Sequence, residues 1–92
     1  MITTIRGHRR INFLNGCTLS IFNGFGSYSE NHFNREVKDK FIINTKQCEI
    51  AIIRNNIFIT NDVLGNGGSV KGYVSEKELK EIIKKVREYD FK

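Results

Sequence analysis

The residues whose types suit acid–base chemistry lie together in the sequence SENH. Ser29, Glu30 and His32 could supply a nucleophile, a carboxylate and a general base. A hydrolase needs these groups to converge on a rigid scaffold, and a nuclease also needs carboxylates that hold a divalent ion. Turn-forming residues surround SENH, so we interpret Glu30, Asn31 and His32 as residues of a loop. We therefore expect no catalytic residue and no enzymatic activity.

The other groups that could do chemistry are His8 and two cysteines, Cys17 and Cys48. None has a second ligand two to five residues away, as a structural zinc site normally has. The glycine-containing sequences GFG and GNGGSVKG lack the order of a dinucleotide-binding turn or a P-loop. We expect no metal and no cofactor. We interpret the cysteines as small buried hydrophobic residues, and a disulfide between them stays open as an alternative.

The sequence NGFGSYSENHFN, residues 23–34, places ring side chains where the backbone should be most irregular. The rings are Phe25, Tyr28, His32 and Phe33. Tyrosine and phenylalanine on a scaffold of glycine, serine and asparagine are typical of an adaptable recognition loop. In the alternative interpretation, the rings fold back over the edge of a sheet as a small hydrophobic cluster.

Positive charge is concentrated near the start of the chain. The net charge is +5, and Arg6, His8, Arg9 and Arg10 lie within one short segment. Such a cluster raises affinity for polyanions or for an acidic protein surface. It also suits a solvated edge strand that discourages aggregation.

The length of 92 residues predicts a single domain over 1–92. No apolar run approaches the roughly 18 residues that a membrane-spanning helix requires. The N-terminus also lacks the layout of a secretion signal. We therefore expect no membrane association and a cytoplasmic location, in the host cell if a phage encodes the chain.

The first part of the chain predicts antiparallel strands. Apolar and polar residues alternate on both sides of Asn15-Gly16, which is a strong hairpin signal. Residues 48–53 and 57–60 are rich in isoleucine and predict two strands joined by a tight turn at Asn55-Asn56. The sequence VKGYV predicts a short last strand. The strand patterns also make Phe13, Phe41 and Phe58 candidates for the core.

The last part of the chain predicts an amphipathic helix. Ser75 and Glu78 form a capping-box pattern. Apolar residues then recur at helical spacing: Leu79, Ile82, Ile83, Val86 and Tyr89. We therefore predict an α+β domain, an antiparallel sheet of about four to five strands with one C-terminal amphipathic helix packed on one face.

The layout of a strand-rich chain with an Asn-Gly hairpin, an irregular NGFGSYSEN segment and a final GYVSEKELKEIIKKV helix resembles the small proteins of phages and mobile elements. Many of these inhibit host defence, and anti-CRISPR proteins are the best-known group. The resemblance implies non-enzymatic binding to a host nucleoprotein. Such inhibitors are often acidic mimics of nucleic acid, whereas this chain carries a net charge of +5.

We therefore expect a small inhibitor that occludes a surface of a host nucleoprotein or nuclease complex. The alternative is a basic nucleic-acid-binding module that uses the aromatic loop and the N-terminal arginines. A homodimer through a strand edge is a further possibility. The expected partner-binding residues are Phe25, Tyr28, Glu30, Asn31, His32, Phe33, Arg6, Arg9 and Arg10.

Overall fold

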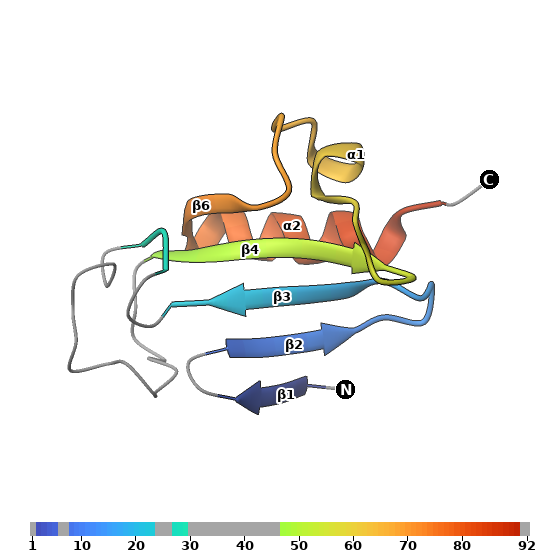
Figure 1. The fold of residues 1–92 in the computed structure, drawn as a ribbon, viewed down its shortest axis with the longest axis horizontal. Coiled ribbons are helices and arrows are strands. Elements are labelled where there is room, and N and C mark those ends of the chain that lie inside the picture. Colours follow the sequence, from blue (N-terminus) through green and yellow to red (C-terminus); the bar gives the residue numbers. More distant parts are fainter. Residues whose placement is uncertain (1, 6–7, 24–26, 30–46, 91–92) are drawn as a thin grey trace.

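A computed structural model describes residues 2–5, 8–23, 27–29 and 47–90, with the backbone alone at 2–5. Along the chain the elements are β1 (Ile2–Ile5), β2 (His8–Asn12), β3 (Thr18–Phe22), β4 (Gln47–Arg54), β5 (Ile57–Phe58), α1 (Thr60–Leu64), β6 (Lys71–Ser75) and α2 (Glu76–Glu88). The strands form one sheet in the order β1-β2-β3-β4-β5, and β6 also pairs with β4 (Figure 1). Every described pair is antiparallel. The predicted α+β class is confirmed, with the two-residue β5 as a short addition to the sheet.

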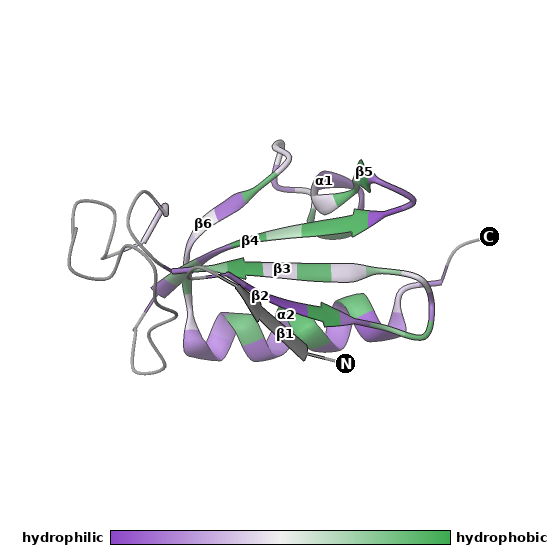
Figure 2. Cartoon of the chain, turned by 60° about the horizontal axis from the view of Figure 1, so that its bottom comes forward, coloured by the Kyte–Doolittle hydropathy of each residue, from purple (hydrophilic) through white to green (hydrophobic). Residues whose placement is uncertain are grey.

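The core lies between the sheet and α2. Alternate residues of the central strands point to α2 and are almost fully buried, as Leu19 of β3 and Ile50 and Ile52 of β4 show. From α2, Ile82 and Val86 complete this core, and Leu79 and Ile83 pack against it, so the predicted apolar stripe is confirmed for these four residues. The helix ends at Glu88, and Tyr89, which was predicted to continue the stripe, is its C-cap. Figure 2 shows α2 along one face of the sheet, with hydrophobic and hydrophilic residues alternating along it. Burial of each such side chain contributes about 1.5–3 kcal/mol.

Both cysteines belong to this core. Cys17 and Cys48 are buried and free. Burial raises the pKa of Cys17, and it raises the pKa of Cys48 to about 11. Both thiols are therefore protonated at neutral pH and behave as small hydrophobic groups, as the sequence predicted.

A tight turn and a helix cap form where the sequence predicts them. Asn55 and Asn56 have φ angles of 53° and 62°, so they form the tight turn between β4 and β5. At the start of α2, the Ser75 Oγ atom accepts a hydrogen bond of 3.2 Å from the Glu78 backbone N–H, which is the serine half of the predicted capping box. The Glu78 carboxylate approaches Lys71 at 3.7 Å.

The β2–β3 hairpin forms as predicted, but its turn differs in detail. Of Asn15 and Gly16, only Gly16 has a positive φ, of 87°. Gly16 donates its N–H to the Phe13 carbonyl at 3.1 Å, and Phe13 donates to the Cys17 carbonyl at 2.8 Å. The turn is therefore longer than a two-residue loop. Asn15 is left to use its side chain, whose Nδ2 donates to the Val86 carbonyl of α2 at 2.7 Å and so ties the hairpin to the end of the helix.

Two predictions about 57–60 are wrong. The strand ends at Phe58, and Thr60 begins the short helix α1. Phe58 is 54% exposed and lies outside the core. The cause is register, since Phe58 pairs with Ile53, whose neighbours Ile52 and Arg54 point to the α2 side of the sheet. Of the other core candidates, Phe13 packs against the core, and Phe41 lies outside the described residues.

At the edge of β4, the Thr60 side chain makes a hydrogen bond that a paired strand would otherwise make. Its hydroxyl is fully buried and accepts a hydrogen bond of 2.9 Å from the Ile52 backbone N–H. The same hydroxyl donates to the Ser69 carbonyl at 2.7 Å. Thr60 therefore joins the point where the chain leaves the sheet to the point where it returns.

Replacing Thr60 by valine should destabilise the protein by about 1–3 kcal/mol, because the isosteric change leaves the buried Ile52 N–H without an acceptor. Urea unfolding measures this change. Thr60→Ser keeps the hydroxyl and should lose clearly less. A Thr60→Val variant as stable as wild type, or a larger loss in Thr60→Ser than in Thr60→Val, would contradict the prediction.

Candidate functional site

The sheet face opposite α2, called here the outer face, carries polar and ring side chains. Strand alternation places His8 and Arg10 of β2 on this face, because Arg9 and Ile11, which alternate with them, point toward the α2 side. Register then places Phe22 of β3 beside His8, and Glu49 of β4 beside Phe22. A stacking ring pair, an arginine and a carboxylate therefore share one face.

His8 and Phe22 stack face to face. Their ring centroids lie 4.1 Å apart, with an interplanar angle of 4°. The pKa of His8 is lowered, first by its partial burial and second by the positive charge of Arg10, while Glu49 acts in the opposite direction. At neutral pH this histidine is therefore a neutral, half-buried stacking partner.

The segment 27–29 reverses the usual placement of polar and ring side chains. Ser27 and Ser29 are buried, with their Oγ atoms 2.7 Å apart, and Asn23 before them is buried too. Tyr28 between the two serines is 50% exposed. The small polar residues therefore anchor this part of the predicted loop, and the ring faces solvent.

A bulge in β6 holds this segment in place. Between the pairs Cys48–Val74 and Ile50–Lys71, the single residue Glu49 lies opposite both Gly72 and Tyr73. Tyr73 has a φ of 53°, which is uncommon for a residue with a side chain.

The Tyr73 backbone N–H donates to the Tyr28 carbonyl at 2.7 Å. The Tyr28 N–H donates to the Glu49 Oε1 atom at 3.2 Å. At Gly72, an added Cβ would lie 2.6 Å from the Tyr28 Cβ, so only glycine leaves room for Tyr28.

The result is two exposed rings on backbones that are joined by a hydrogen bond, Tyr28 and Tyr73, which we call the tyrosine pair. Tyr73 is 57% exposed. Sequence reasoning placed Tyr73 in the last strand and gave it no binding role. The available signal was Gly72, because glycine inside a short strand often marks a bulge or a close approach of another segment.

The structure separates residues that the sequence placed in one predicted site. Arg10 is exposed on the outer face, whereas Arg9 is half-buried on the α2 side of β2. Tyr28 is exposed beside β6. The other predicted partner-binding residues lie outside the described residues: Arg6, Phe25, Glu30, Asn31, His32 and Phe33.

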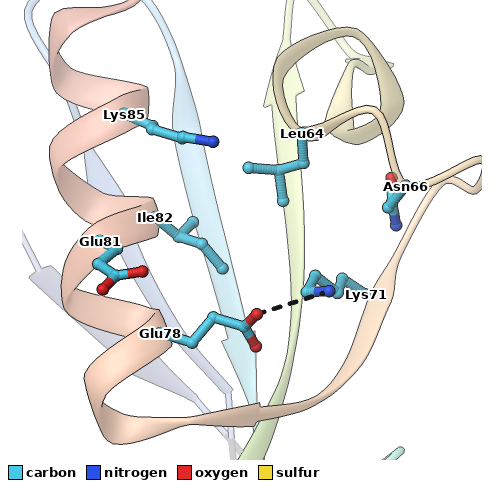
Figure 3. A pocket seen from close by; sticks show the side chains of 7 residues that line it. All are labelled: Leu64, Asn66, Lys71, Glu78, Glu81, Ile82 and Lys85. Carbon is cyan, nitrogen blue, oxygen red and sulfur yellow. Dashed lines mark ion pairs between the residues drawn. The ribbon is translucent and has the colours of Figure 1, made fainter.

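A cavity of about 140 Å³ lies between α1, β6 and α2 (Figure 3). Leu64 and Ile82 form its apolar part, and Lys71 approaches Glu78 at 3.7 Å across it. The volume is below the roughly 300–1,000 Å³ of a typical ligand pocket. Glu81 and Lys85 of α2 complete its charged lining.

Over the ranges that the structure describes, no three His, Cys, Asp or Glu residues are grouped so that they could hold a metal ion. No helix in this part of the chain is long and apolar enough to cross a membrane. No protein-family model, curated protein or solved structure matches the chain. The geometry of the described residues is therefore the basis for a functional proposal.

Replacing Gly72 by alanine should destabilise the protein by about 1–3 kcal/mol, because the new Cβ forces Tyr28 and its segment to move. Urea unfolding measures the stability, and backbone NMR shifts at 27–29 report the movement. Gly68→Ala is the matched control, since its Cβ would meet only the Val70 carbonyl at 3.4 Å. Unchanged shifts at 27–29 in Gly72→Ala would contradict the close approach.

The free energy of unfolding should fall as pH drops below 6.5, the ordinary pKa of histidine. Because the pKa of His8 is lowered in the folded protein, the unfolded chain binds this proton first. Stability is then lost between 6.5 and the lower pKa of the folded state. Urea unfolding from pH 8 to pH 5 tests this. His8→Phe keeps a stacking ring but cannot titrate, so it should lose less stability, and the same loss in both proteins would contradict the prediction.

Proposed function

We propose that this chain is a non-enzymatic binding protein whose tyrosine pair docks onto a protein partner. The observation that supports the proposal is the exposure of two rings whose backbones are fixed by hydrogen bonds to each other and to Glu49. Tyrosine supplies a large contact area with few rotatable bonds, so two tyrosines on a backbone that is already fixed lose little conformational entropy on binding.

The surroundings of the pair favour a protein over a phosphate backbone. Glu49 accepts the hydrogen bond from the Tyr28 backbone N–H, so a carboxylate lies beside the Tyr28 backbone and repels phosphate. Arg10 on the same face can pair with an acidic residue of a partner. Aromatic residues and arginine are the residue types that most often dominate the binding energy of protein interfaces.

The resemblance to small phage and mobile-element proteins suggests a biological role for this binding. The chain would act as an inhibitor that covers a functional surface of a host nucleoprotein or nuclease complex. Occlusion of a surface requires affinity and no reaction. This role fits a site that is built from rings and hydrogen bonds.

The test compares tagged wild-type protein with two variants in nuclease-treated bacterial lysate. Tyr28→Ala/Tyr73→Ala removes the proposed anchors, and Phe58→Ala removes a ring of similar exposure elsewhere. A discrete protein partner should be retained by wild type and Phe58→Ala. The double variant should bind this partner at least about 100-fold more weakly, because hot-spot residues each contribute 2 kcal/mol or more.

Thermal unfolding of all three proteins provides the control for folding. Both variants should unfold near the wild-type temperature, since they truncate exposed rings. Retention of the partner by a folded double variant would overturn the proposal. Loss of all bound material on nuclease treatment would favour the nucleic-acid-binding alternative.

A further inference from the structure

Two turns lie at the same end of the sheet and expose apolar side chains (Figure 1). One joins β2 to β3 and the other joins β4 to β5, and we call residues 14–16 and 55–57 the turn end. Leu14 in the first turn is 110% exposed, so its side chain points away from the protein. Ile57 beside the second turn is 63% exposed. Exposed apolar side chains that gather in one place mark an interaction surface.

A groove of about 360 Å³ lies beside Leu14. Asn15 connects the two, since its carbonyl accepts a hydrogen bond of 3.3 Å from Arg54 Nε and its Nδ2 donates to the Tyr89 carbonyl at 3.3 Å. Arg54 and Tyr89 both line the groove, whose volume falls within the roughly 300–1,000 Å³ of a typical ligand pocket. The groove can therefore admit a side chain. Its lining residues are Arg54, Asn55, Ile57, Ile59, Asp62 and Tyr89.

We infer that two copies of this chain associate through the turn end, with Leu14 of each copy inserted in the groove of the other. A two-fold dimer needs a surface that complements itself, so each feature and its counterpart must lie on the same copy. The turn end meets this condition in shape, because the protruding Leu14 side chain and the groove lie side by side. It meets the condition in charge as well, because Arg54 and Asp62 give the groove charges of both signs.

Other occupants fit the turn end less well. A membrane surface or a nucleic acid selects an excess of positive charge, whereas the groove carries Asp62 as well as Arg54. A small ligand would fill the groove but leave Leu14 exposed. A second copy fills the groove and covers Leu14 in the same contact.

Sedimentation velocity of the whole chain from about 5 to about 500 μM tests the inference, since a small interface is expected to be weak. At about 150 mM salt, charges more than about 8 Å apart are largely screened. The mass should rise from that of one copy to that of two. Leu14→Asp should weaken the dimer at least about 100-fold, because each dimer contains the change twice and each change places a charge in an apolar groove.

The matched control is Tyr73→Asp, which should self-associate like wild type. Both variants replace an exposed large apolar side chain and lower the net charge of +5 by one, so they differ in the position of the change. Asp is also among the residues that tolerate the left-handed backbone of Tyr73. Thermal unfolding of the dilute proteins should give similar temperatures for wild type and Leu14→Asp, because the Leu14 side chain is exposed in the single copy.

Disulfide formation tests which residues meet. Leu14→Cys and Ile57→Cys are mixed in the presence of glutathione disulfide, and the native thiols do not compete because Cys17 and Cys48 are buried and protonated. The disulfide between the two variants should form in clear excess over random pairing, since a disulfide requires close and well-oriented residues. Preferential pairing of Leu14→Cys with itself would overturn the inserted geometry.

A wild type that stays monomeric at every concentration would overturn the inference. A dimer that Leu14→Asp weakens no more than Tyr73→Asp would also overturn it, because the contact would then lie elsewhere, as at a strand edge. These measurements use this chain alone and are independent of the proposed protein partner. Leu14→Asp should retain that partner and Tyr73→Asp should lose it, so failure of one proposal leaves the other standing.

Discussion

The fold depends on how one edge of β4 is shared between two strands. β5 pairs with β4 at Ile53 and Arg54, and β6 pairs with it from residue 47 to residue 50. The Ile52 backbone N–H lies between these two pairings, and an unpaired buried N–H would cost about 1–3 kcal/mol. The Thr60 hydroxyl accepts the hydrogen bond from this N–H. The Thr60 side chain therefore lets the chain depart from the sheet into α1 while the Ile52 N–H of β4 keeps a hydrogen-bond acceptor.

The positions of the tyrosine pair and of α2 follow from this arrangement. The Thr60 hydroxyl also holds the Ser69 carbonyl, so the chain returns to the sheet at a fixed place and β6 starts at Lys71. The bulge in β6 then sets the backbone of Tyr73, which in turn binds the Tyr28 carbonyl. At its other end β6 passes directly into α2, with Ser75 as the cap. The tyrosine pair and α2 therefore share one structural support.

Features that neighbouring residues determine could be predicted from the sequence. The Asn55-Asn56 turn, the Ser75 cap and the apolar stripe of α2 each depend on conformational preferences or spacing within a few residues. Phe58 was predicted wrongly because its environment depends on the register between strands and not on its own alternating pattern. Tyr73 was missed as a site residue for a related reason. Its exposure depends on a bulge that forms only when β6 meets β4.

The tyrosine pair is separate from the packing between the sheet and α2. Tyr28 donates to Glu49, which belongs to the outer face, and α2 covers the opposite face. A partner can therefore contact the exposed rings without disturbing the core that α2 completes. The net charge of +5 would speed the first encounter with an acidic partner, and the tyrosine pair would then determine how long the complex lasts.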